Sequence, residues 1–219
     1  MLHKYHSAIL TETLSRNFST PALREIIQAN LDQDSLQTFF QHQIHFDESK
    51  FAEALAYIEE QRAIIARNHD PHDMRKALGR LTHGAQDFYA HSNYVDLWLD
   101  QNGGLEQTRA ADIDGLDPAI LNNPALRSDY FYWWRDFIYY VPIFKTFAKK
   151  YLVFVNSHES MHLDDPSRGP KFFYALKAAE QRTLIEYQRA LKTVDPAMLH
   201  LFHGSPEPRY KLLPQLKTA

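Results

Sequence analysis

The segment Leu81-Thr-His-Gly-Ala-Gln-Asp-Phe-Tyr-Ala-His-Ser-Asn-Tyr94 carries three polar side chains spaced four residues apart, His83, Asp87 and His91. In an α-helix, residues four apart lie only about 40° from one another around the axis, so the three would form a line along one face. Imidazole nitrogens and carboxylate oxygens are ligands that zinc accepts, and the line could belong to a metal site. In a chain with 12 histidines, a solvent-facing polar face is the alternative.

The composition favours helices over strands in the rest of the chain. Only 7 of the 219 residues are glycine, and Ala, Leu, Gln, Glu and Arg, which favour helices, dominate the periodic stretches. Hydrophobic residues make up 44% and charged residues 23%, as in an ordinary globular protein. We therefore expect an all-α fold: a single multi-helix, metal-binding domain over residues 1–204, followed by a C-terminal arm or tail over residues 205–219.

Several helix starts are marked by a capping side chain directly before a proline. Ser19-Thr20-Pro21 and Asp70-Pro71 combine a side chain that can accept from free amide groups with a proline suited to the first turn. The second of these begins the helix that contains the segment quoted above. The same pair recurs at Asp117-Pro118, Asp165-Pro166 and Asp195-Pro196. Apolar periodicity predicts further helices over about residues 3–15, 48–68 and 171–192.

The charge balance and the absence of cysteine limit the chemistry of the chain. A net charge of −3 provides no basic field for nucleic acid, which makes that partner less favoured. Without cysteine, any metal must be held by His, Asp, Glu or backbone groups. The first residues lack the apolar run of a secretory signal, and no stretch is long enough to span a bilayer. We expect a cytoplasmic protein without a transmembrane segment.

Aromatic residues are dense between residues 128 and 155. Such a stretch can be core, can line an apolar pocket, or can contact a membrane at the headgroup layer. Core is the favoured interpretation, and peripheral membrane contact stays among the alternatives. Pro142 is expected to kink the stretch or divide it into two helices.

Further ligand-type residues are spread along the chain and would have to be brought together by folding. They are His3, His6, Asp34, His45, His158 and His162, the last followed by Asp164 and Asp165. Other chemistries fit less well. No thiol nucleophile or Gly-x-Ser-x-Gly motif is present, and only one Glu-x-x-His pair, Glu159 with His162, matches the two that a di-iron bundle requires.

Four short motifs occur in an order that resembles a known superfamily. They are His6-Ser-Ala-Ile-Leu-Thr, Asn30-Leu-Asp-Gln-Asp34, His45-Phe-Asp47 and Gln86-Asp-Phe-Tyr-Ala-His-Ser-Asn93. Together they resemble the zinc-dependent phospholipase C and single-strand nuclease superfamily, and the last is most similar to its Het-C-like branch. Over about residues 3–95, the resemblance implies an all-helical fold of the zinc-dependent phospholipase C type, with two or three zinc ions in a cleft.

The resemblance also implies a set of metal ligands. Asp34, His45, His83 and Asp87 would hold one zinc ion, with Asp87 bridging to a second ion at His6, while His91 and His158 would hold a third. Known members use the free amino-terminal residue as a ligand, and His3 would substitute for it here. The closing ligand is left open among His162, Asp164 and Asp165.

The implied chemistry is hydrolysis of a phosphoester by metal-activated water, because clustered zinc lowers the pKa of bound water to about 7. Asp34 or Asp87 would orient or deprotonate that water. Supporting hydrogen bonds would come from Gln86, Ser92 and Asn93, and a substrate pocket from Tyr89, Tyr94 and Trp133.

Three functions follow as hypotheses. The leading one is a zinc-dependent phosphodiesterase acting on a small phosphoester or a phospholipid-like substrate. A single-strand nuclease is the second. The third, from a different class, is a non-catalytic helical binding module with a structural metal.

Overall fold

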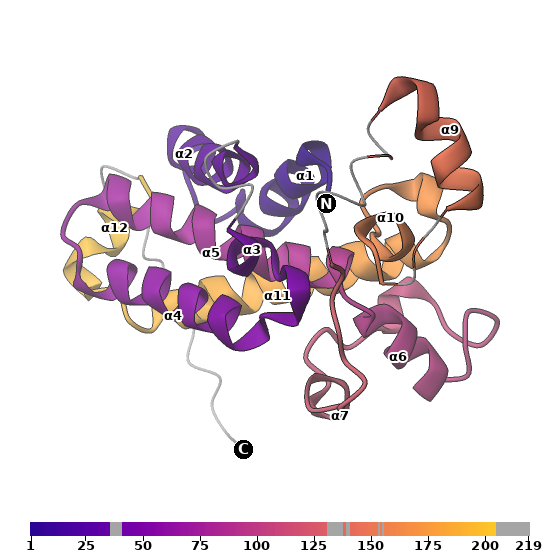
Figure 1. Ribbon diagram of the computed structural model, residues 1–219. Helices are drawn as coiled ribbons and strands as arrows, with labels where there is room; N and C mark the ends of the chain where they lie inside the picture. Colours follow the sequence, from indigo (N-terminus) through magenta and orange to yellow (C-terminus); the bar gives the residue numbers. More distant parts are fainter. Residues whose placement is uncertain (36–40, 131–137, 139–140, 153, 155, 205–219) are drawn as a thin grey trace, which may run out of the picture.

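One long helix, α5 (Pro71–His91), runs through the middle of the molecule and has other helices packed around it (Figure 1). In this computed structural model, the described residues are 1–219 without 36–40, 131–137, 139–140, 153, 155 and 205–219. Against α5 pack α2 (Thr20–Leu31), α4 (Phe51–Arg67) and α11 (Lys171–Leu191), and α1 (His3–Leu14) packs on α2 and α11. The described residues contain no β-strand, only isolated bridges, which confirms the predicted all-α, single-domain fold.

Shorter elements complete the chain. They are η1 (Asp32–Asp34), α3 (His42–His45), η2 (Asp47–Ser49), α6 (Tyr94–Gln101), η3 (Ala110–Asp112), α7 (Pro118–Leu121), α9 (Pro142–Tyr151), α10 (His158–Met161), η5 (Pro166–Arg168), η6 (Pro196–Met198) and α12 (Leu199–Phe202).

The helix starts marked by a capping residue and proline are where the sequence predicts them. Ser19 caps α2, and Asp70 caps α5 by accepting from the His72 amide at 2.8 Å. Asp117 caps α7 in the same way, but the Asp-Pro pairs at 165 and 195 begin the short 3-10 turns η5 and η6. The predicted helix over 48–68 begins only at Phe51, because Glu48 and Ser49 have positive φ angles that end regular helix.

Glycines on α5 allow its neighbours to approach closely. At Gly79, an added Cβ would overlap the carbonyl oxygen of Ile26 and lie 2.9 Å from the Cβ of Ala29, both on α2. At Gly84 it would lie 2.7 Å from the carbonyl oxygen of Ile44 on α3. Because a side chain fits at neither position, α2 and α3 are held close to the polar face of α5.

Two parts of the sequence-based description fall outside the described residues. They are the tail over residues 205–219 and most of the aromatic run before Pro142, Trp133 included. At Pro142 the proline occupies the first turn of α9, where its missing amide donor costs nothing. Within the described parts, the helices are all too short or too polar to cross a lipid bilayer.

Candidate metal centre

The line His83, Asp87 and His91 on α5 is buried. The three residues are 0%, 1% and 7% exposed, respectively. A solvent-facing polar stripe, the alternative to a metal site, therefore does not describe this face. Buried polar groups need partners, and each of the three has polar groups from other elements against it.

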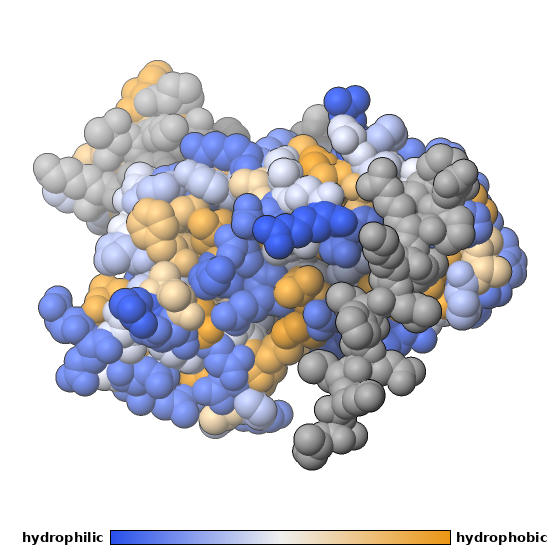
Figure 2. All heavy atoms as spheres, turned by 180° about the vertical axis from the view of Figure 1, so that it is seen from behind, coloured by the Kyte–Doolittle hydropathy of each residue, from blue (hydrophilic) through white to orange (hydrophobic). Residues whose placement is uncertain are grey.

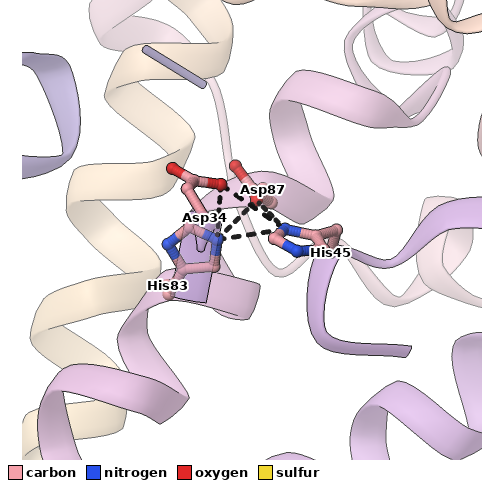
Figure 3. Close-up of side chains that lie close together, drawn as sticks. All are labelled: Asp34, His45, His83 and Asp87. Carbon is pink, nitrogen blue, oxygen red and sulfur yellow. Dashed lines mark hydrogen bonds and ion pairs between the residues drawn. The ribbon is translucent and has the colours of Figure 1, made fainter. Parts of the chain in front are cut away.

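The first centre consists of Asp34, His45, His83 and Asp87, whose ligand atoms lie within 4.8 Å of one another (Figure 3). Oδ2 of Asp87 lies 2.9 Å from Nε2 of His83 and 3.1 Å from Nδ1 of His45. The two imidazole nitrogens are 3.1 Å apart. Oδ1 of Asp34 is 3.5 Å from the His83 nitrogen and 3.8 Å from the His45 nitrogen.

Three separate elements position the first centre. His83 and Asp87 are one turn apart on α5, His45 ends α3, and Asp34 ends η1. The two short elements gain little stability from their own helical hydrogen bonds. The arrangement of the site therefore depends on tertiary contacts, among them the packing of α3 against α5 and α4.

The other oxygen of the Asp87 carboxylate faces a different set of groups. Oδ1 lies 2.7 Å from the amino nitrogen of Met1 and 3.2 Å from Nε2 of His6. The Met1 nitrogen also lies 3.1 Å from Oδ1 of Asp164. The amino group of Met1 thus lies at the position beside Asp87 that His3 was expected to fill.

His3 is found at the rim of the site. Its side chain is 61% exposed, and its Nε2 lies 3.0 Å from Oδ2 of Asp34. His3 therefore contacts the first centre through Asp34, while the structure brings His6 to Asp87.

Gln86 fixes the orientation of the His6 ring. Its side-chain amide donates to Thr183 at 3.0 Å, and its Oε1 lies 2.5 Å from Nδ1 of His6 and 3.3 Å from Nδ2 of Asn30. Because Nδ1 of His6 donates to Oε1, a neutral His6 ring has its free lone pair on Nε2, facing Asp87. The supporting role expected of Gln86 therefore has a geometric basis.

Two groups of the first centre, His83 and Asp87, are held in the protonation states that a metal requires. Burial lowers the pKa of His83 to about 4, so the ring is neutral at pH 7. Burial raises the pKa of Asp87, but the Met1 amino group and the surrounding histidines together outweigh it and hold this pKa well below its usual value. Metal ligation needs neutral imidazole and ionised carboxylate. For His45, burial lowers the pKa, but the hydrogen bond and charge of Asp87 together with the charge of Asp47 outweigh it and raise this pKa above its usual value.

The described part of the chain contains two further groups of ligand-type residues: His91 with Asp129 and His158, and His158 with His162 and Asp164. Nδ1 of His158 is 2.6 Å from Oδ2 of Asp129. Nδ1 of His162 is 3.0 Å from Oδ2 of Asp164, and the His158 and His162 rings stack at 4.7 Å. Among the three residues left open as a closing ligand, His162 and Asp164 lie in this group. Asp165 instead accepts from the Ser167 amide.

His91 differs electrostatically from His83. Its Nδ1 lies 3.0 Å from Oδ1 of Asp47, and its Nε2 lies 3.3 Å from Oδ1 of Asp164. Burial and the positive charge of the Met1 amino group lower the pKa of His91, but the surrounding carboxylates, among them Asp87, Asp129 and Asp164, together outweigh these effects and raise it well above its usual value. A charged imidazolium flanked by carboxylates is an ion pair, so the first centre is better suited to a metal than the group around His91.

A cavity of about 580 Å³ opens beside these groups. Its wall includes the metal-ligand candidates Asp34, His45, His91, His158 and Asp164, together with Met1, Leu2, His3, Lys4, His42 and Asp47. Two members of the first centre, Asp34 and His45, therefore border a space large enough for a small ligand.

Other residues proposed from the sequence have structural roles. Ser92 donates to the Phe88 carbonyl, and Asn93 donates to the Ala125 carbonyl at 2.9 Å and accepts from the Arg127 amide at 2.8 Å. The Ser92 bond closes the last turn of α5, and the two Asn93 bonds secure the loop that leads to Asp129.

The pocket residues expected from the sequence are found elsewhere. Tyr89 and Tyr94 are fully buried in the core, and their hydroxyls donate to the carbonyls of Gly115 and Asp114. Neither lines the cavity, because both point from α5 and α6 into the packed interior. Trp133 lies outside the described residues.

Sequence reasoning missed several residues of the site. Asp47 and Asn30 occur in the quoted motifs without being assigned to the site, and Asp129 and Thr183 are not singled out by the sequence at all. Asp129 is 1% exposed and contacts His158. A lone aspartate ahead of an aromatic run carries no local signal, so only its burial reveals it.

Comparison with known proteins links the first half of the chain to one family. Residues 2–108 match the family model described as the VWA7 N-terminal domain. The human von Willebrand factor A domain-containing protein 7 is 37% identical over 87 residues, which are 38% of this chain and 10% of that protein. The mouse protein of the same name is 36% identical over the same shares. The match thus spans about a tenth of these relatives' length. No solved structure matches the chain.

These findings correct the resemblance drawn from the motifs. The matched family is the VWA7 N-terminal domain, and not the zinc-dependent phospholipase C and nuclease superfamily or its Het-C-like branch. The prediction of a phospholipase C-like phosphodiesterase was therefore wrong, and no match supports a hydrolase. Many kinds of helical metal site place His and Asp at this spacing, so such motifs are weak evidence of a particular reaction. The comparisons point to a VWA7-like N-terminal domain over residues 2–108.

Proposed function

We propose that this chain is a non-catalytic helical binding module whose centre is tied together by one zinc ion at Asp34, His45, His83 and Asp87. The observation that carries the proposal is the convergence of two imidazole nitrogens and two carboxylates on one point in the interior. Three of the four residues are buried. Two nitrogen and two oxygen donors, with no cysteine in the chain, suit zinc.

The spacing of the ligand atoms supports tetrahedral coordination. Zinc bonds of about 2.0–2.1 Å place neighbouring ligand atoms of a tetrahedron roughly 3.3 Å apart. The separations that involve an imidazole nitrogen range from 2.9 Å for Asp87 with His83 to 3.8 Å for Asp34 with His45, and so lie on both sides of this value.

A structural role suits the elements that the ligands connect. The metal would join η1 and α3, which are three and four residues long, to α5. Such short segments do not hold their positions by helix formation alone. Binding free energy from the ion would be folding free energy for this region.

The binding role rests on the matched family and on the cavity. The relatives are far longer than the matched segment, and the family model describes an N-terminal domain, as expected for one module among several. The cavity of about 580 Å³ is our candidate for the place where a ligand binds. Its volume is typical of ligand pockets.

Elemental analysis of the full chain tests the metal. Purified without added metal, the chain should contain about one zinc ion, coordinated only by nitrogen and oxygen in X-ray absorption spectra. Asp87→Asn keeps the side-chain shape but removes the charge, and zinc content should fall close to zero. The matched control is Asp73→Asn, because Asp73 lies on the same helix, is 51% exposed and lies outside the first centre.

The same experiment can refute the proposal. A wild-type chain that contains no zinc and takes none up from buffered zinc would exclude the site. Retention of zinc by the Asp87→Asn variant would remove the first centre from consideration. A tightly held water in the zinc coordination shell would indicate an open site, contrary to a structural role.

A further inference from the structure

Helix α9 (Pro142–Tyr151) carries a face of exposed apolar side chains. Ile143 is 85% exposed, Phe144 53%, Phe147 55% and Tyr151 60%. Positions 143, 147 and 151 are four residues apart and therefore lie on one side of the helix. Ala148 is fully buried, so the helix packs on the protein through a small residue while its large side chains face outward. A contiguous exposed apolar patch usually marks an interaction surface.

The position of α9 makes this face accessible. Figure 1 shows α9 at one corner of the molecule, apart from the bundle formed by α2, α4, α5 and α11. From behind, a small group of hydrophobic atoms is visible at the upper edge of the corresponding corner (Figure 2). The patch is extended along the chain by Leu152 and Phe154, which are 38% and 37% exposed.

The sequence of α9 combines this apolar face with positive charge. Pro-Ile-Phe-Lys-Thr-Phe-Ala-Lys-Lys-Tyr contains Lys145, Lys149 and Lys150 and no acidic residue. The whole chain has a net charge of −3, so the helix is a local basic segment in an acidic protein. A basic amphipathic helix with aromatic residues is typical of segments that lie in the headgroup layer of a membrane.

We propose that α9 docks on the surface of an anionic lipid membrane, with Ile143, Phe144, Phe147 and Tyr151 inserted among the headgroups. A helix of ten residues is about 15 Å long, half the thickness of the hydrocarbon core, so it lies in the interface and does not span it. The positive charges of Lys145, Lys149 and Lys150 complement the negative charge of anionic lipid headgroups, and this is why we commit to a membrane as the occupant. This inference is independent of the zinc ion.

Vesicle sedimentation of the full chain tests the inference. The chain should sediment with vesicles of phosphatidylcholine and phosphatidylserine, and less with phosphatidylcholine alone. Raising the salt concentration should release it, since anionic lipids attract basic segments within a Debye length. The double variant Ile143→Ser/Phe147→Ser should lower the affinity about ten-fold, because it removes apolar surface that would be buried in the interface.

A matched control separates insertion from general loss of hydrophobicity. The variant Leu55→Ser/Leu201→Ser alters two residues that are also exposed, 47% and 41%, but that lie on α4 and α12. It should bind vesicles as the wild type does. Circular dichroism of both variants should give unchanged helix content, since all four side chains face outward.

The charged residues need a variant of their own. Lys145→Gln/Lys149→Gln/Lys150→Gln should reduce binding to the anionic vesicles and leave the weak binding to phosphatidylcholine unchanged. The inference is overturned if the wild type binds neither vesicle, or if the α9 variants bind as well as the wild type. It is also overturned if the α9 variants abolish a dimer in light scattering without any change in vesicle binding, because the face then belongs to a second copy.

Discussion

Asp87 and His83, one turn apart on α5, meet through Oδ2 and Nε2 at 2.9 Å, and both side chains are buried. The same oxygen lies 3.1 Å from His45, while the other carboxylate oxygen faces the Met1 amino group and His6. Asp87 is therefore the residue that connects the first centre to the amino-terminal segment. Substitutions in and around α5 can separate what the metal, the hydrogen bonds and the packing each contribute to the stability of the fold.

Removal of zinc should loosen η1 and α3 before the rest of the molecule. A ligand present at a thousand times its dissociation constant stabilises the folded state by about 4 kcal/mol, which corresponds to roughly 10 °C in Tm for a chain of this size. Chelation should lower the Tm by about this amount. Hydrogen exchange should become faster at residues 32–34 and 42–45, while the middle of α4 should stay protected. Uniform loss of protection would argue against a local structural metal.

Gln86→Leu should destabilise the fold without touching the first centre. Leucine has about the same size but leaves His6, Asn30 and Thr183 without the amide group that they contact. Each buried polar group without a partner costs about 1–3 kcal/mol, so we expect a loss of about 3 kcal/mol in urea unfolding. Gln28→Leu, at an exposed position on α2, should cost little. Equal stability of the two variants would contradict the role assigned to Gln86.

Gly79→Ala should destabilise the protein although alanine is the better helix former. The gain in helix propensity is about 1 kcal/mol. However, the new Cβ would overlap the Ile26 carbonyl and lie in close contact with Ala29 on α2. Overpacking of this kind costs about 1–3 kcal/mol. Thermal unfolding should give a lower Tm than that of the wild type. Lys76→Ala, an exposed position on the same helix, should have almost no effect, and a Tm of Gly79→Ala above wild type would disprove the close approach.

The buried carboxylate of Glu186 should make stability depend on pH in a predictable direction. It lies 2.5 Å from Arg62, 2.7 Å from Arg182 and 2.9 Å from Arg189. Burial raises the pKa of Glu186, but Arg182 and Arg62 outweigh it and lower the pKa below 4.5. Its contribution to stability is present above pH 4.5, the unfolded value, and is lost as the pH falls through the lower folded value.

The variant Glu186→Gln measures this contribution. Breaking a buried ion pair costs about 3–5 kcal/mol, so at pH 7 the variant should be less stable than the wild type by about this amount. The difference should shrink as the pH falls below 4.5. Because both proteins contain the same histidines, histidine titration cancels in the comparison. Glu53→Gln, at an exposed position on α4, should show no such difference in stability. If the difference in stability between the wild type and Glu186→Gln grew as the pH fell, the role given to Glu186 would be wrong.

The sequence by itself determined the helical class, many helix starts and the polar line on α5. Capping by Ser19 or Asp70 and the four-residue spacing of His83, Asp87 and His91 depend on neighbouring residues, so the sequence reveals them. Outside α5, the sequence supplied candidate metal ligands such as Asp34 and His45, but not the distances between them and α5. It did not determine the reaction, because the same spacing suits many metal sites and the inferred hydrolase was wrong.

Only the tertiary structure decided which groups meet. Asp34 and His45 reach His83 because η1 and α3 pack beside α5, where Gly84 leaves room for the backbone at Ile44. Asp129 becomes part of the site because its loop is bonded to the end of α5, a contact across many residues of chain. Tyr89 and Tyr94, by contrast, fill the core. Contacts between distant segments depend on how whole helices pack, and no local pattern encodes that packing.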